Sequence, residues 1–347
     1  MSIPFYDIRQ ENLAFAPEFY AAFEEILKSG RFVLGNQLTC FEKELADYLN
    51  VNQVIGLKSG TDALYFGLRT LGIKKGDEVI TTPFTFPATV EAILHTGAKP
   101  VLADIEPETL CLNPEGCKAA ITKKTRAILL VHLFGNCADL NQFIHLCDKH
   151  NLFLIEDAAQ AIGAEYRGKK LGSFGTCATF SFYPTKNLGA IGNGGALVGK
   201  KLCIDCPNSS RLDELQAAFL RIKLAHLEQW LNRRRQIALR YESALNQFVK
   251  IVKSARESKS NHHQFAIRTP LRDQLRKFLS QHGIETMVYY PRPVHLQPGF
   301  AAHFNACQLP EAERASAEVL CLPNRQNLTD SEIQVIINMV AKFFGSK

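Results

Sequence analysis

One short apolar run of the chain leads directly into two carboxylates, in the sequence LFLIEDAAQ at residues 152–160. Comparable apolar runs lie on either side of it, at residues 53–57, 78–81, 100–103, 127–132, 178–182 and 195–198. Because both faces of these runs are apolar, and helical patterns separate them, they fit strands of a mostly parallel sheet that is covered by helices. The sequence therefore predicts an α/β domain.

The pattern of the sequence changes after about residue 210. Residues 211–241 lack Pro and Gly and repeat apolar side chains at helical spacing, which predicts one long helix or two. The remainder of the chain predicts a strand and two helices, at residues 264–268, 273–282 and 330–344. We therefore expect a large domain over residues 1–235, including an N-terminal segment, and a smaller C-terminal α+β domain over residues 236–347.

Composition excludes several classes of protein. Of the 347 residues, 46% are apolar and 21% charged, so the chain is not disordered, collagenous or a coiled coil. The net charge is +6 and, apart from the arginines at 233–235, the basic residues are scattered, which argues against nucleic acid as a partner. The chain begins without a leader-like pattern and has no uncharged apolar run of bilayer-spanning length. We expect a cytoplasmic protein with no membrane partner.

The cysteines predict neither disulfides nor a metal site. There are ten of them, scattered across a chain that is large enough to need no disulfide staples, so we expect reduced thiols. The CxxC at residues 203–206 has no second pair at zinc-ribbon spacing, and it favours a loop or buried thiols.

Ligands of open α/β sheets bind beyond the carboxyl ends of the strands, so the turns after the predicted strands are candidates for a site. The turn KSGTDAL at 58–64 places small residues at the start of a helix, where backbone N–H groups and the helix dipole favour an anion. The same residues also fit an ordinary helix N-cap. Asp157 ends a buried strand, where its carboxylate would suit a protonated pyridine nitrogen or would cap the next helix.

Three further residues follow predicted strands. Lys186 lies in FSFYPTKNLG at 180–189, where burial would make its amine able to attack a carbonyl, although a lone lysine is more often a solvated surface residue. Phe86 suits stacking on a planar ring or packing in a core. His132 either lies near the ligand or is a structural histidine. An anion-binding turn, an aryl face, a carboxylate and an amine together describe a site for pyridoxal phosphate.

Six motifs occur along the chain in the order SGTDAL (59–64), GDEVI (76–80), EDAAQ (156–160), SFYPTKNL (181–188), SRLDELQA (210–217) and HLQP (295–298). In sequence and in order they resemble the DegT/StrS-type sugar aminotransferases, which are pyridoxal phosphate enzymes of fold type I. The resemblance runs nearly from end to end of the chain. It implies a mostly parallel sheet in a large domain, with a smaller α+β domain at the C-terminus.

The resemblance also implies roles around the cofactor. Lys186 would form the Schiff base with the cofactor aldehyde and, once freed, would move the proton between the cofactor and the sugar carbon. Asp157 would keep the pyridine nitrogen protonated, Gln160 would bond the ring hydroxyl and Phe86 would stack on the ring.

The cofactor phosphate and the sugar have their own candidates. The resemblance implies that the phosphate is held by Gly60, Thr61 and Ser181. Tyr183 and His295 match positions near the sugar. The sites of the family lie between two subunits, so a homodimer is expected.

The chain departs from the family in one stretch. Between the strand at 195–198 and the motif at 210–217 it is shorter than its relatives, which suggests a wider pocket. Relatives usually have an Asn two residues before Arg211 that reaches the partner's cofactor phosphate. Here Ser209 stands at that position and Asn208 one place earlier, so Asn208 is the candidate for the contact.

The resemblance implies an aminotransferase that moves an amino group from L-glutamate to the keto group of a nucleotide-linked sugar. The sequence HLFG at 132–135 is closer to relatives that act at C3 than at C4. One alternative is a cofactor-dependent sugar dehydratase of the same family, but those members carry His in place of the lysine at 186. The other is a catalytically idle binding or regulatory protein, against which the retention of both Lys186 and Asp157 argues.

Overall fold

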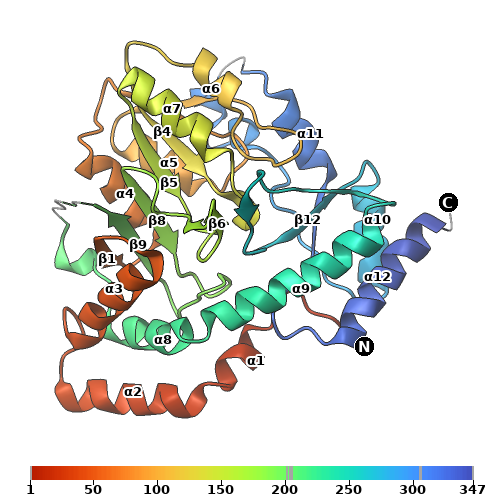
Figure 1. Ribbon diagram of the computed structural model, residues 1–347, viewed down its shortest axis with the longest axis horizontal. Coiled ribbons are helices and arrows are strands. Elements are labelled where there is room, and N and C mark those ends of the chain that lie inside the picture. The colour runs from red at the N-terminus through yellow and green to blue at the C-terminus, as the bar shows by residue number, and fades with distance from the viewer. Residues whose placement is uncertain (1, 201, 203–205, 305–306, 346–347) are drawn as a thin grey trace.

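The computed structural model describes all residues except 1, 201, 203–205, 305–306 and 346–347. The described residues form a central sheet of seven strands, which are β1 (Gln53–Leu57), β2 (Glu78–Thr81), β3 (Lys99–Leu102), β4 (Thr125–Val131), β5 (Phe153–Asp157), β8 (Cys177–Ser181) and β9 (Gly195–Gly199). Their order in the sheet is β1-β9-β8-β5-β4-β2-β3, and only β9 runs antiparallel to its neighbours (Figure 1). Each predicted run forms one of these strands, so the predicted mostly parallel sheet is confirmed.

Helices cover both faces of the sheet. One face packs against α3 (Asn36–Leu49), α7 (Leu140–His150) and α8 (Glu214–Leu224), and the other against α4 (Gly60–Thr70) and α5 (Ala88–His95). Along β4, Ile128 and Leu130 enter the first apolar cluster, whereas Ala127 and Leu129 enter the second. This alternation explains why the strand is apolar at every position from Ala127 to Val131.

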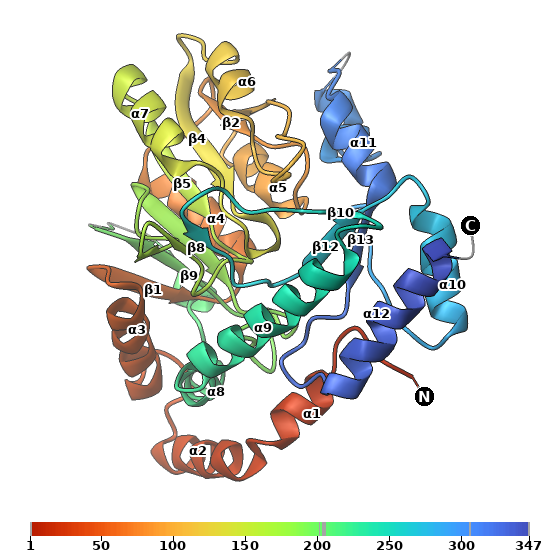
Figure 2. The ribbon, with the colours of Figure 1, turned by 45° about the vertical axis from the view of Figure 1, so that its right-hand side comes forward.

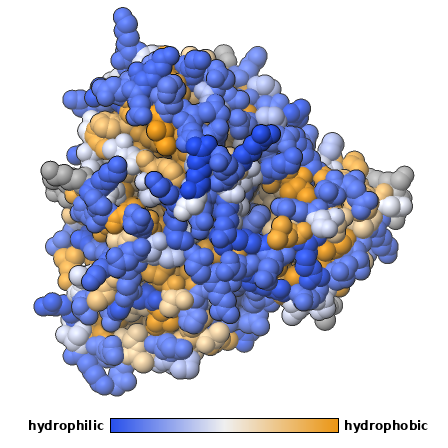
Figure 3. Space-filling model, in the orientation of Figure 1, coloured by the Kyte–Doolittle hydropathy of each residue, from blue (hydrophilic) through white to orange (hydrophobic). Residues whose placement is uncertain are grey.

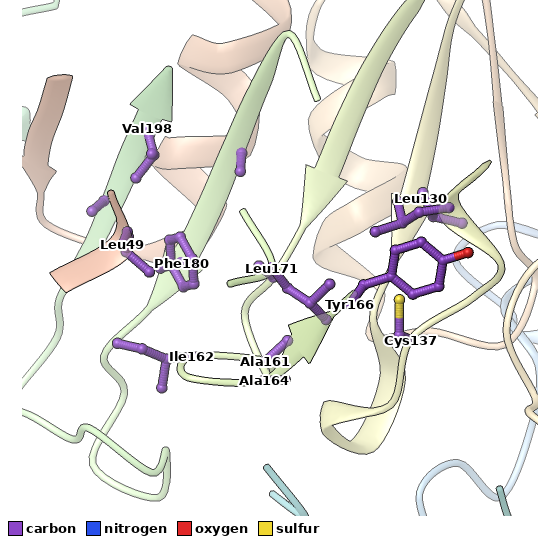
Figure 4. Packing of buried hydrophobic residues seen from close by; sticks show 14 of the residues in the cluster. Leu49, Leu130, Cys137, Ala161, Ile162, Ala164, Tyr166, Leu171, Phe180 and Val198 are labelled. Atoms are coloured by element: carbon purple, nitrogen blue, oxygen red, sulfur yellow. The ribbon is translucent and has the colours of Figure 1, made fainter. Parts of the chain in front are cut away.

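The first cluster holds several of the cysteines. Figure 4 shows its interior, where the ring of Tyr166 lies beside Leu130 and Cys137. The predicted reduced thiols include Cys111, Cys117, Cys147 and Cys177, which are buried free thiols whose pKa burial raises to about 12.

The helical stretch after residue 210 forms two helices, α8 and α9 (Leu227–Leu245). Figures 1 and 2 show α9 running from α8 beside the sheet to the C-terminal region of the molecule. It passes the predicted domain boundary at 235/236 without a break, and the boundary stays a prediction. Before the sheet, α1 (Ile8–Leu13) and α2 (Ala16–Ser29) lie along the lower edge of the molecule in Figure 1.

The C-terminal region has its own small sheet and core. Its described elements are β10 (Lys250–Ile251), β12 (Phe265–Arg268), α10 (Arg272–Gln281), α11 (Pro310–Glu318), β13 (Val319–Leu322) and α12 (Asp330–Gly345). A third apolar cluster joins α9, α10, α12 and β12, and it includes Ile3 from the N-terminal segment. The backbone of Ile3 bonds to Gly283 and Glu285, so the start of the chain is fastened to this region. A second small sheet contains β6 (Glu165–Tyr166), β7 (Lys169–Lys170) and β11 (Ser258–Lys259).

The structure also bears on the other expectations from composition. None of the described helices is both long and apolar enough to cross a bilayer, and the described residues contain no group of three or more potential metal ligands. Each arginine of the run at 233–235 is engaged within the chain, with Asp330, Asn324 and Ser260 respectively. The CxxC at 203–206 and the shortened stretch at 199–210 fall partly outside the described residues, and so does the wider pocket suggested there.

Candidate active site

Asp157 and Lys186 both lie at the carboxyl end of the sheet. Asp157 is the last residue of β5, which lies between β4 and β8, and Lys186 follows β8 in the next turn. Burial lowers the pKa of the Lys186 amine to about 8, and the charge of Asp157 opposes that shift. The charge of one group therefore influences the pKa of the other, as expected for two residues that share a site.

The carboxylate of Asp157 is buried and held in place by hydrogen bonds. The Thr89 hydroxyl donates to one oxygen across 2.9 Å, and the Ala159 N–H donates to the other across 3.2 Å. Burial raises the pKa of Asp157, and these two hydrogen bonds oppose the rise. The alternative of a helix cap is wrong, because residues 158–164 form turns and no helix. A buried carboxylate in this state would gain from a cationic partner.

The neighbouring carboxylate, Glu156, belongs to the scaffold. Its oxygens accept hydrogen bonds from Nε2 of His132 at 3.0 Å and from the backbone N–H groups of Gly172, Phe174 and Gly175 at 2.7–2.8 Å. Burial alone would raise the pKa of Glu156, but these donors outweigh it and hold the pKa below its usual value. His132 is therefore a structural histidine through Nε2, while its buried Nδ1 has no hydrogen-bond partner among the described residues.

Lys186 occupies a tight turn rather than open surface. The turn closes through Lys186 N–H to Tyr183 O and Ala190 N–H to Phe182 O, each at 2.8 Å. Gly189 packs so closely on Pro184 that a Cβ at Gly189 would lie 2.4 Å from the Pro184 carbonyl oxygen. Lys186 itself is half-buried, so the reading of a solvated surface lysine is wrong.

The turn at residues 58–64 fits both interpretations of its sequence, a helix N-cap and an anion-binding turn. Ser59 is the N-cap of α4 and its side chain accepts from the Asp62 N–H at 3.0 Å. The N–H groups of Gly60 and Thr61 donate no hydrogen bond within the described part of the chain. A Cβ at Gly60 would lie 2.8 Å from Cβ of Ser181, so this side chain abuts the turn. The three predicted phosphate residues are thus together at a helix N-terminus.

Gln160 and Phe86 lie beside a residue that the sequence did not reveal. Gln160 accepts from the Phe134 N–H at 2.7 Å and donates to the hydroxyl of Tyr290 at 3.1 Å. The ring centroids of Tyr290 and Phe86 are 6.4 Å apart. The side chain of Phe86 is 58% exposed, so it does not pack in a core. Tyr290 belongs to the C-terminal region and lies 130 positions after Gln160 in the sequence. No local sequence pattern predicts this contact.

The remaining predicted residues differ in their burial and contacts. Tyr183 is exposed next to Ser181. His295 is buried, with Nε2 3.2 Å from Glu313 and with no hydrogen-bond partner for Nδ1 among the described residues. Asn208 is exposed, and its side chain makes no hydrogen bond in the described structure. The nearby Ser210 carbonyl accepts from the Lys58 N–H at 2.9 Å, which places this stretch beside the start of the anion-binding turn, and the role of Asn208 stays a prediction.

These residues fit pyridoxal phosphate. The cofactor needs an amine for its aldehyde, an acid for its ring nitrogen and hydrogen-bond donors for its phosphate. Lys186 has a lowered pKa, Asp157 is buried without a cationic hydrogen-bond partner among the described residues, and the N–H groups of Gly60 and Thr61 are available. Each of the three requirements thus has a matching group in the described residues.

Comparison with known proteins agrees with this arrangement. The sequence matches the model of the DegT/DnrJ/EryC1/StrS aminotransferase family over residues 14–205 and 200–341. It is 39% identical to the dTDP-3-amino-3,4,6-trideoxy-α-D-glucose transaminase of Streptomyces venezuelae, over 98% of this chain and 96% of that one. It is 42% identical to the pleiotropic regulatory protein of Geobacillus stearothermophilus, over 99% of both chains.

Solved structures show the same fold. The crystal structure of S. venezuelae DesV in complex with a ketimine intermediate superposes with a TM-score of 0.94 and 39% identity, over 99% of this chain and 98% of that one. The fold type, the enzyme class and the pyridoxal phosphate cofactor predicted from the sequence are confirmed. The chain belongs to the DegT/DnrJ/EryC1/StrS aminotransferase family of pyridoxal phosphate-dependent enzymes.

Proposed function

We propose that this enzyme transfers an amino group from L-glutamate to the keto group of a nucleotide-linked sugar, at C3 of the sugar ring. The observation that carries the proposal is that the Lys186 amine, whose pKa burial lowers to about 8, and the buried carboxylate of Asp157 lie at the carboxyl end of the sheet, near enough for their charges to interact. An amine that is partly neutral near physiological pH can attack a carbonyl and can also accept a proton. The same amine is therefore suited to holding the cofactor and to moving protons once freed.

Each side chain has a separate task in this proposal. Bound pyridoxal phosphate supplies an electron sink for the carbanion. Asp157 holds the proton on the ring nitrogen, and Thr89 fixes the direction of that carboxylate through its hydrogen bond of 2.9 Å. Gln160, oriented by Phe134 and Tyr290, bonds the ring hydroxyl. Gly60, Thr61 and Ser181 hold the phosphate, and Phe86 covers the ring.

The names of relatives support the substrate class. The S. venezuelae relative is named as a transaminase for a dTDP-linked 3-amino sugar. The HLFG sequence at 132–135, which favours C3, also lies at the site, because the Phe134 N–H donates to Gln160. Tyr183 and His295 are proposed to contact the sugar. In this proposal the amino product feeds a surface glycan or a secondary metabolite. The proposal also places the enzyme in the cytoplasm.

A homodimer is part of the proposal. Apolar side chains are exposed along α2 and the loop after it, at Tyr20, Phe23, Leu27, Phe32, Val33 and Leu34. Figure 3 shows apolar patches interrupting the mainly hydrophilic face of the molecule in one view. A concentration of exposed apolar side chains in one segment of the chain is typical of protein interfaces. A second copy of the chain would cover it and would bring Asn208 to the neighbouring phosphate site.

Two other functions are less well supported. A sugar dehydratase of this family would carry His at position 186, where this chain has Lys. The G. stearothermophilus relative is named as a regulatory protein, but a binding protein has no need of a lowered lysine pKa beside a buried acid. Both observations favour the transaminase.

The proposal is tested by incubating the cofactor-loaded enzyme with L-glutamate and a panel of 3-keto and 4-keto nucleotide sugars. We expect mass spectrometry to detect an amino sugar from a 3-keto substrate, together with an equal amount of 2-oxoglutarate. The Lys186→Ala variant should give neither product. A loaded wild-type enzyme that aminates no member of the panel would contradict the proposed substrate class.

A further inference from the structure

A buried lysine outside the described site touches the turn that carries Lys186. Lys223, on α8, is fully buried. Its ammonium donates to the carbonyl oxygen of Gly189 at 2.7 Å and to the side-chain oxygen of Asn12 at 3.1 Å, and it lies 2.8 Å from a carboxylate oxygen of Glu11. A buried ammonium is costly unless it is paired and hydrogen-bonded, and these contacts supply two hydrogen-bond acceptors and one opposite charge. Gly189 is the residue whose close packing on Pro184 closes the Lys186 turn.

The partners of Lys223 continue into the C-terminal region. The other carboxylate oxygen of Glu11 accepts from the side chain of Gln326 at 2.7 Å. The Gln326 oxygen in turn accepts from Arg234 at 2.8 Å, and Arg234 also donates to the carbonyl of Asn324 at 2.8 Å. An unbroken series of polar contacts thus leads from the Lys186 turn through the N-terminal segment to residues 324–326.

The same series returns to the catalytic turn by a second path. The side chain of Asn324 donates to the carbonyl of His262 at 2.9 Å. The next residue, His263, is buried and lies 3.1 Å from the side-chain oxygen of Asn187, which directly follows Lys186 in sequence. The Lys186 turn is therefore held at Asn187 and at Gly189 by elements that are themselves joined to each other.

We propose that Lys223 is a positioning residue for Lys186, which it acts on through the carbonyl of Gly189. This inference rests on the proposed role of Lys186. By anchoring the base of the turn to Glu11 and Asn12, Lys223 fixes how deeply the Lys186 amine is buried and how it faces Asp157. If Lys223 contributed only to stability, its removal from a protein that stays folded would change neither the exchange of the turn amides nor the ionisation of the Lys186 amine.

Hydrogen exchange of the Lys223→Met variant, without cofactor, tests the inference directly. We expect the N–H groups of Lys186 and Ala190, which close the turn, to exchange about 10- to 100-fold faster than in the wild type, as loss of one charge-assisted hydrogen bond predicts. Lys223→Arg, which keeps the charge and the donors, should restore most of the protection. Lys170→Met is the matched control, because Lys170 pairs with Glu228 away from this turn, and it should leave the two amides unchanged.

A second readout follows the amine itself. In Lys223→Met the pH midpoint for capture of added pyridoxal phosphate by Lys186 should rise from about 8 toward the value of an exposed lysine, because the looser turn is better hydrated. If Lys223→Met does not fold, the paired variant Lys223→Gln/Glu11→Gln, which removes both charges together, carries the same expectation. Wild-type exchange and a wild-type midpoint in a folded variant would overturn the inference, whatever its melting temperature. Neither readout uses a sugar or an amino donor, so its outcome is independent of the proposed substrate.

Discussion

The hydroxyl of Thr89 donates a hydrogen bond to the carboxylate of Asp157 across 2.9 Å, from the first turn of α5 to the last residue of β5. Thr85 lies 2.9 Å from the Thr89 hydroxyl and completes a short chain of donors. This contact fixes the direction of the carboxylate that we propose to face the cofactor ring. It joins residues 68 positions apart in the sequence, in a part of α5 that otherwise packs in the core.

The first prediction concerns this contact. Thr89→Val keeps the shape of the side chain and leaves a buried carboxylate oxygen without its donor, so we expect affinity for pyridoxal phosphate to fall about tenfold. Fluorescence titration of the apoprotein measures it. Thr96→Val, at the other end of α5, should bind the cofactor normally, because the Thr96 hydroxyl bonds to backbone groups of Ile93 and Ala98 and not to Asp157. Equal affinity in wild type and Thr89→Val would show that the bond does not orient Asp157.

The two adjacent carboxylates should respond in opposite ways to removal of their charge. The folded-state pKa of Glu156 lies below its usual value, so its contribution to stability is present at neutral pH and is lost as pH falls through that lower pKa. Glu156→Gln should therefore lower the free energy of unfolding at pH 7, by about 3 kcal/mol. Because burial raises the pKa of Asp157, its charge is destabilising at pH 7, and Asp157→Asn should stabilise the apoprotein.

Transamination activity should also distinguish the roles of Asp157 and Glu156. Asp157→Asn should lower transamination about 100-fold or more, because an amide cannot hold the ring nitrogen protonated. Chemical denaturation and a steady-state assay on both variants provide the measurements. An Asp157→Asn protein that is less stable than wild type at pH 7, with activity retained, would reverse the roles assigned to residues 156 and 157.

The pH dependence of cofactor capture tests the environment of Lys186. The neutral amine is the nucleophile, so the rate at which apoprotein captures pyridoxal phosphate should rise with pH and level off above a midpoint of about 8. Stopped-flow absorbance across pH 6–10 records the profile, after correction for the titration of the free cofactor. A midpoint near that of an exposed lysine, about 10.4, would place the amine in water instead.

The exposed apolar side chains of α2 predict self-association. Tyr20→Glu places a charge in the proposed interface and should shift sedimentation from dimer to monomer, with weaker cofactor binding if Asn208 acts across that interface. Leu239→Glu, at another exposed apolar position on α9, is the control and should remain dimeric. A wild-type protein that sediments as a monomer would contradict the proposed dimer.

The sequence predicts the sheet well because its strands are buried on both faces, and such apolar runs leave little ambiguity. Lys186 and Asp157 were identified because each directly follows or ends such a run. Tyr290, Thr89 and Lys223 could not be found in this way. Their functional contacts join segments far apart in the sequence, and each residue type is common in its own element.

The role of Glu156 could not be predicted from the sequence alone. In the sequence it is indistinguishable from Asp157, since both end the same apolar run. Because successive side chains of a strand point to opposite faces, Asp157 reaches Thr89 whereas Glu156 reaches His132. The two carboxylates can be told apart only by their hydrogen-bond partners, which are set by the tertiary structure. These partners assign Glu156 to the scaffold and leave Asp157 as the candidate for the cofactor. The same holds for His132, whose pairing with Glu156 through Nε2 is not predicted by any local pattern in the sequence.

The most direct test of the account is to locate the covalent attachment of the cofactor. Purified enzyme loaded with pyridoxal phosphate is reduced with borohydride, digested and analysed by peptide mass spectrometry. We predict a single modified peptide that carries the phosphopyridoxyl group on Lys186. Modification of a different lysine, or none in a protein that binds the cofactor, would contradict the central claim that residue 186 holds the cofactor opposite Asp157.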